Sequence, residues 1–128
     1  MIQQEGPGWR LARDASRPVF PVLIGGEGWA FELTEMEAEG LVTLLSALTD
    51  QHQALRSQLM AEESIELEME SGAWWGCLEG SRDLWRVQVV LEGRDGARGL
   101  EAHWPATAAP AFVTAMRTAW DCSSHKQD

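Results

Sequence analysis

Three features of this sequence could support chemistry: possible metal ligands, possible nucleophiles and a glycine-rich turn. His52, His103 and His125 stand far apart, and neither they nor the two cysteines have the His-x-x-x-His or Cys-x-x-Cys spacing of a metal site. The Gly-x-Ser-x-Gly motif of many serine hydrolases is absent as well. We therefore expect no catalytic residue, no metal and no cofactor, and we interpret the chain as non-enzymatic.

The glycine-rich turn could in principle hold a phosphate, since Gly25, Gly26 and Gly28 are close in sequence. A phosphate-binding loop opens a helix, because the helix N-terminus attracts the anion. These glycines instead precede residues 29–33, where apolar side chains alternate as they do in a strand. The sequence therefore predicts a hairpin turn here.

Binding of single-stranded nucleic acid would need aromatic platforms for the bases and a basic groove for the backbone. Four tryptophans could serve as platforms: Trp74, Trp75, Trp85 and Trp104. The alternation predicts, however, that the open face of the second half carries Glu66, Glu68, Glu70, Arg86, Gln88, Glu101 and His103. Four carboxylates against one arginine oppose phosphate binding, which depends on cations. This charge disfavours binding of nucleic acid. A basic cluster at one end of the sheet remains possible if four arginines gather there: Arg82, Arg86, Arg94 and Arg98.

Trp74 and Trp75 are neighbours on a predicted strand, so their indoles point to opposite faces of it. One of them must therefore point away from the core. An exposed tryptophan commonly marks an interface, unless a helix or a second sheet covers it. We therefore predict that a protein partner, or a second copy of the chain, binds a surface formed by Trp74, Trp75, Arg82, Arg86, Arg94 and Arg98.

Bulk properties limit the class of protein. The chain has 128 residues, which indicates one domain, and we expect an ordered core over about 6–120 and a polar tail over 121–128. Its net charge of −10 keeps it soluble and away from membranes and anionic polymers. No apolar stretch is long enough to span a membrane, and the first residues do not resemble a signal peptide.

Cysteine usage bears on the compartment. Cys77 lies in an apolar run and Cys122 in the polar tail. Two cysteines form no disulfide framework, although a bond between them stays open. The pattern favours two reduced thiols in a cytoplasmic protein.

The strands that position these residues follow from alternation and turn signals. Predicted strands cover residues 9–12, 20–24, 29–33, 65–70, 73–79, 84–92 and 100–104. The clearest is 65–70, where Ile65, Leu67 and Met69 alternate with three glutamates. Pro21 restricts the second strand to an edge or a bulge.

Two helices are predicted. Thr34 and Glu37 form a capping box, and a stripe of leucines at helical spacing then predicts a helix over about 35–61. A second helix is predicted over 108–120, where Phe112, Met116 and Trp120 share one face.

The fold class follows from this order. Short connections imply antiparallel strand pairs. We predict an α+β protein of two antiparallel β-meander-plus-helix units, each with three or four strands and a helix packed across them, joined in one domain.

Several segments resemble a known family. Gly8-Trp9-Arg10-Leu11 and residues 20–34, which contain Gly-Gly-Glu-x-Trp-Ala, are similar to the opening of an uncharacterised cyanobacterial family, domain of unknown function 1818. Residues 59–63 and 104–106 resemble its middle and late segments, so the likeness covers about residues 6–120. It implies a Whirly-like fold, as in transcriptional-coactivator domains that bind single-stranded DNA. It implies no activity, and it suggests nucleic acid by association only.

Overall fold

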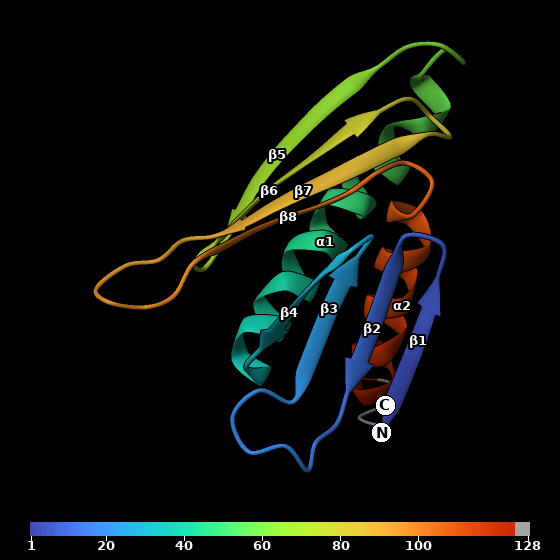
Figure 1. Ribbon diagram of the computed structural model, residues 1–128. Coiled ribbons are helices and arrows are strands. Elements are labelled where there is room, and N and C mark those ends of the chain that lie inside the picture. The colour runs from blue at the N-terminus through green and yellow to red at the C-terminus, as the bar shows by residue number, and fades with distance from the viewer. Residues whose placement is uncertain (125–128) are drawn as a thin grey trace.

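The computed structural model describes the backbone of residues 1–124 and the side chains of residues 1–120. Within that part of the chain the elements are β1 (Ile2–Gly6), β2 (Trp9–Arg13), β3 (Val22–Gly26), β4 (Trp29–Leu33), α1 (Glu35–Leu55), η1 (Arg56–Gln58), β5 (Ile65–Ser71), β6 (Trp74–Gly80), β7 (Trp85–Leu91), β8 (Leu100–Trp104) and α2 (Ala109–Ser124). Figure 1 shows the two sheets as separate layers, with both helices beside them.

Each half of the chain forms a four-stranded antiparallel meander, with strand orders β1-β2-β3-β4 and β5-β6-β7-β8. This confirms the predicted α+β class and the order of strands and helices. β1 was not predicted. It pairs with β2 through a hairpin in which Gly8 has a φ of 79°, a conformation that favours glycine. The first meander therefore has four strands.

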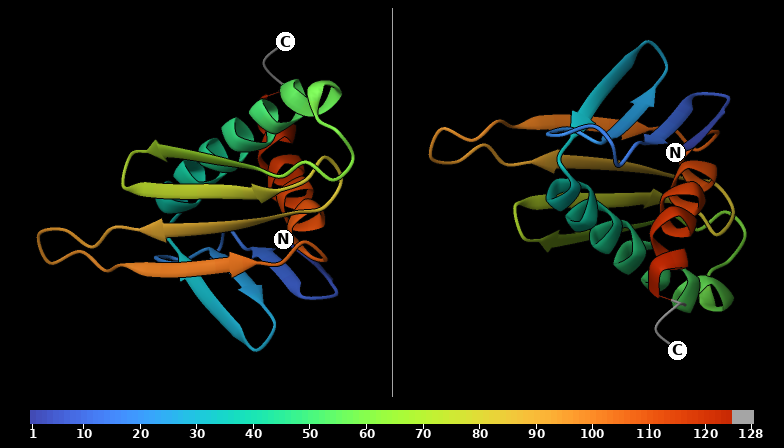
Figure 2. Two further views of the ribbon diagram at one scale, coloured as in Figure 1. Left: turned by 90° about the horizontal axis from the view of Figure 1, so that it is seen from above. Right: turned by 90° about the horizontal axis from the view of Figure 1, so that it is seen from below.

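The helices do not each cover the meander that precedes them, which corrects the predicted two-unit arrangement. α1 follows β4 but lies mainly against β5 and β6 of the second sheet. α2 lies against β1 and β2 of the first sheet and also touches β7 and α1. The view from below in Figure 2 shows α1 crossing beneath β5 and β6, with α2 beside it.

A glycine in β6 allows α1 to approach the second sheet closely. A Cβ atom added to Gly76 would lie 2.6 Å from Cδ2 of Leu44 and 3.2 Å from Cδ1 of Leu48. The leucine stripe of α1 therefore fills the space that a side chain would need. This shape match allows α1 to pack tightly on β6.

The helix ends only partly follow the prediction. The capping box is confirmed, since the N–H of Glu37 donates to Oγ1 of Thr34 at 3.1 Å and the N–H of Thr34 donates to Oε1 of Glu37 at 2.8 Å. α1 ends at Leu55 and not near residue 61, because the chain tightens into η1 and then becomes extended at Leu59. α2 continues beyond residue 120 to Ser124. The rest of the predicted polar tail, residues 125–128, is outside the described part of the chain.

Trp104 joins the two sheets. Its ring is fully buried, stacks on Phe112 of α2 at 3.9 Å between centroids, and lies 5.2 Å from the Trp29 ring. Its indole N–H donates to the carbonyl of Gly25 in β3 at 2.9 Å. The buried apolar residues accordingly form one cluster that includes both sheets and both helices. Neither described helix is both long and apolar enough to cross a membrane.

Candidate interaction surface

The outer face of the second sheet carries the residues that alternation assigns to it, and of the predicted interaction surface it holds Trp75 and Arg86. Both helices lie behind it in the view from above in Figure 2. The strand register places its side chains in three rows, Glu66-Glu79-Arg86, Glu68-Cys77-Gln88-His103 and Glu70-Trp75-Val90-Glu101. We call these eleven residues the open face. Five of them are glutamates and one is arginine, so the face is strongly acidic, as the alternation predicts.

The two adjacent tryptophans separate as predicted, one on each side of β6. Trp74 is 3% exposed, and its indole N–H donates to the carbonyl of Glu37 in α1 at 2.9 Å. Trp75 is half-buried on the open face between Glu70 and Val90. Trp74 is therefore a core residue, while Trp75 belongs to the exposed surface.

The predicted aromatic platforms for nucleic acid are correspondingly fewer than four. Trp74 and Trp104 are both buried, so neither can stack on a base. Trp85 is half-buried on the inner side of β7, where its ring lies 5.6 Å from that of His52. Trp75 is the one of the four that lies on the open face.

Cys77 lies beside Trp75 at the bottom of a small depression of about 120 Å³, lined by Glu66, Glu68, Trp75, Cys77, Glu79, Arg86 and Gln88. Burial raises the pKa of the Cys77 thiol, and the surrounding carboxylates, Glu66 and Glu68 foremost, raise it further. The thiol is free and stays protonated near neutral pH. The side chain of Cys122 is outside the described part of the chain.

Arg86 is the cation of the open face, but it is already paired. Its guanidinium donates to the carboxylate of Glu79, with Nε at 2.9 Å from Oε1. This hydrogen bond, together with the charge of Glu79, raises the pKa of Arg86 above its ordinary value. Arg86 therefore offers no free positive charge to a phosphate.

The four arginines do not gather at one sheet end, which is the arrangement that the sequence left open. Arg94 and Arg98 lie in the loop after β7, whereas Arg82 lies in the turn before it, so the two groups flank opposite ends of that strand. Arg94 pairs with Glu92 beside it in sequence. Arg98 reaches the start of α1, where it donates to Glu37 at 2.6 Å.

Arg82 instead lies near two arginines that sequence reasoning missed, Arg56 and Arg117. Arg56 follows His52 by four residues, which is the spacing of neighbours on one helix face, and this signal could have found it. Arg117 comes from α2, and no local pattern connects it with the other two. In the part of the chain that the structure describes, no three His, Cys, Asp or Glu side chains are grouped to hold a metal ion.

Comparison with known proteins agrees with this architecture. A crystal structure of a protein with unknown function from Prochlorococcus sp. NATL2A, assigned there to the DUF155 family, is similar with a TM-score of 0.85 and 40% identity over 94% of this chain and 99% of that chain. No curated protein matches. A family model described as "Domain of unknown function (DUF1818)" matches residues 4–119, as the sequence resemblance implied. Because that match covers most of the chain, from within β1 to within α2, the chain belongs to the DUF1818 family.

Proposed function

We propose that this protein is a non-enzymatic binding domain whose open face docks a protein partner that presents basic side chains around an apolar contact. The observation that supports this most strongly is Trp75, which lies beside Val90 on an uncovered sheet and is surrounded by carboxylates. Tryptophan is enriched among the residues that contribute most to protein interfaces. The acidic surround favours lysines and arginines on the partner.

Charge decides between a different partner and a second copy of this chain. The open face carries one arginine against its five glutamates: Glu66, Glu68, Glu70, Glu79 and Glu101. Two such faces repel each other, and like-charge juxtaposition across an interface is costly. A basic partner gains instead from attraction during the encounter. We therefore assign the open face to a basic protein partner.

The spacing of Cys77 and His103 on the open face supports a binding role over catalysis there. Cys77 and His103 share a row of the open face, but Gln88 stands between them. Two strand spacings separate the cysteine from the histidine by about 10 Å, too far for the histidine to take the thiol proton. The free thiol also fits a cytoplasmic protein, since reduced cysteines persist there.

Nucleic acid binding is the rival. Two four-stranded meanders, each followed by a helix, fit a Whirly-like fold, and Trp75 could stack on one base. Phosphate binding draws on counterion release by cations, and the one arginine of the open face, Arg86, is already paired with Glu79. A titration with fluorescent single-stranded oligonucleotides at low salt tests this rival, and we expect no binding at about 10 µM protein, where weak non-specific contacts begin to register. Binding that Arg86→Glu weakens would replace our proposal with the rival.

The proposal itself is tested by locating a defined basic probe on the protein. A synthetic peptide of alternating lysine and leucine is titrated into isotope-labelled protein, with a glutamate and leucine peptide as the matched control. We expect the basic peptide to shift the NMR signals of outward residues on β5–β8 and the indole signal of Trp75, assigned through Trp75→Phe. Shifts confined to other surfaces, or equal shifts with the acidic peptide, would overturn the proposal.

A further inference from the structure

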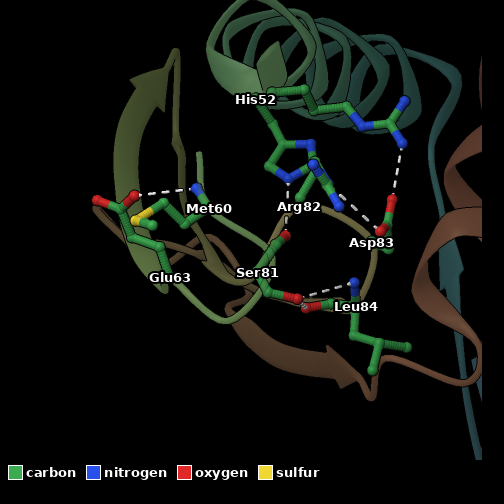
Figure 3. A network of polar contacts seen from close by, with 8 residues as sticks. His52, Met60, Glu63, Ser81, Arg82, Asp83 and Leu84 are labelled. Atoms are coloured by element: carbon green, nitrogen blue, oxygen red, sulfur yellow. Dashed lines mark hydrogen bonds and ion pairs between the residues drawn. The ribbon is translucent and has the colours of Figure 1, made fainter. Parts of the chain in front are cut away.

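A second site, separate from the open face, lies where the end of α1, the β6–β7 turn and the start of α2 converge. It is a cleft of about 340 Å³ lined by Thr49, Asp50, His52, Gln53, Arg56, Arg82, Asp83, Trp85, Pro110 and Arg117. Figure 3 shows His52 reaching from the helix toward the turn that carries Arg82 and Asp83. We call it the arginine cleft.

The turn that carries Arg82 is held in place by buried groups. His52 is 3% exposed, and its Nε2 lies 3.0 Å from the carbonyl oxygen of Ser81, which requires Nε2–H as the donor. The N–H of Ser81 donates to the carbonyl of Leu84 at 2.8 Å, which closes the turn. The ring of Trp85 packs against His52 beneath it. The cleft is therefore built on a fixed scaffold.

Three arginines face two aspartates in this cleft, which leaves one positive charge in excess on a chain whose net charge is −10. Arg56 donates to Asp83 at 2.7 Å. Arg117 donates to Asp50 at 2.8 Å and to the hydroxyl of Thr49 at 2.9 Å. Both aspartates are thus already neutralised by their own arginines.

Arg82 supplies the excess charge. It forms a single ion pair, from Nε to Oδ2 of Asp83 at 3.5 Å, and Asp83 already accepts from Arg56. The contact from Nε acts as a hydrogen bond that helps to lower the pKa of Asp83, whereas the two terminal nitrogens of Arg82 have no hydrogen bond to a described residue and remain available. Nε of Arg56 is also buried without an acceptor. Buried donors without an acceptor are rare, and a bound water or ion is one explanation for them.

We propose that the arginine cleft binds the phosphate group of a small molecule, either a phosphomonoester or free phosphate. The planar guanidinium of Arg82 matches the oxygens of a phosphate in a bidentate geometry. The cleft volume is at the lower end for small-molecule sites, which suits a small ligand. Trp85 and Pro110 provide apolar surface for the organic part of an ester.

NMR titration of the full chain with inorganic phosphate and with phenyl phosphate, at constant ionic strength, tests this proposal. We expect saturable shifts at residues 49–56 and 81–85. Arg82→Gln should weaken binding by about tenfold, because it removes a charged hydrogen-bond pair. Arg94→Gln removes an arginine at the other end of β7 and should leave binding unchanged. Arg82→Lys, which keeps the charge but loses the planar fork, should be intermediate.

The two probes distinguish the two sources of phosphate. Tighter binding of phenyl phosphate would identify an ester whose organic part contacts Trp85, and equal binding would identify free phosphate. The proposal is overturned if no saturable shift occurs, if Arg82→Gln binds like the parent while its spectrum shows a folded protein, or if Arg94→Gln loses as much affinity as Arg82→Gln. None of these outcomes depends on the open face.

Discussion

At the scale of single residues, Trp74 and Trp75 are adjacent in sequence but differ in what they stabilise. Trp74 is buried and hydrogen-bonded to α1, so Trp74→Ala should lower the free energy of unfolding by about 3–5 kcal/mol. Trp75→Ala should cost about 1 kcal/mol, because that ring is half-buried on the open face. Urea unfolding of both variants measures the difference. Equal losses would mean that Trp75 is a core residue and no interaction site.

Much of the open face could be predicted from sequence because alternation along a strand assigns each side chain to a face. Glu66, Glu68 and Glu70 lie where the pattern places them. The arginine cleft could not be predicted in this way. Arg56 and Arg117 come together only through the packing of two helices, and sequence spacing contains no information on that contact.

At the scale of elements, the start of α1 is held by a charge as well as by a cap. Burial raises the pKa of Glu37, but hydrogen bonds from Arg98 and from the N–H of Thr34 outweigh it and leave the pKa below its ordinary value of 4.5. When folding lowers the pKa of a carboxyl, the protein is stabilised at pH values above the pKa of the unfolded state. That stabilisation is lost as the pH falls through the pKa of the folded state.

Glu37→Gln tests this charge, since glutamine can still cap the helix. We predict that Glu37→Gln is less stable than the parent at about pH 7. The difference in free energy of unfolding should be smaller at about pH 3, because protonation of the carboxylate increases in both states as the pH falls through the folded-state pKa. Urea unfolding at the two pH values measures it. Glu39→Gln, an exposed carboxylate of the same helix, should show no such change. A stability difference between Glu37→Gln and the parent that does not change with pH would mean that Glu37 stabilises α1 only as a capping residue.

The crossing of α1 over β6 depends on Gly76. Gly76→Ala should lower the free energy of unfolding by about 1–3 kcal/mol, because the new methyl group meets Leu44. Leu44→Ala alone should cost about 2–5 kcal/mol by leaving a cavity. The double variant should lose less than the sum, because removing the leucine side chain clears the space for the methyl. Strict additivity in denaturant unfolding would contradict the contact.

Periodicity predicted most elements but not their partners. A leucine stripe identifies the buried face of α1, yet it does not say that this face packs on β5 and β6, where Gly76 leaves room for Leu44. β1 was missed because its residues are mostly polar, and its order comes from pairing with β2. The helix end was overestimated because Leu59 continues the leucine pattern although the backbone there is extended.

At the scale of the whole molecule, net charge and its distribution determine what can associate. The charge of −10 is concentrated in part on the open face, so copies of the chain should repel there. We predict a monomer of 14.2 kDa in light scattering at physiological salt. A dimer that Trp75→Ala dissociates would instead assign the open face to self-association.

The most direct test of the account compares the affinity of the basic lysine and leucine peptide for the parent and two variants by calorimetry. We predict that Trp75→Ala weakens binding by more than about tenfold, as expected for a central interface tryptophan. Combined replacement of Glu66, Glu68 and Glu70 by glutamine should also weaken binding of the peptide and make that binding less dependent on salt. Arg94→Gln, away from the open face, should bind like the parent. Unchanged affinity in both open-face variants would contradict the proposal that this surface binds a basic partner.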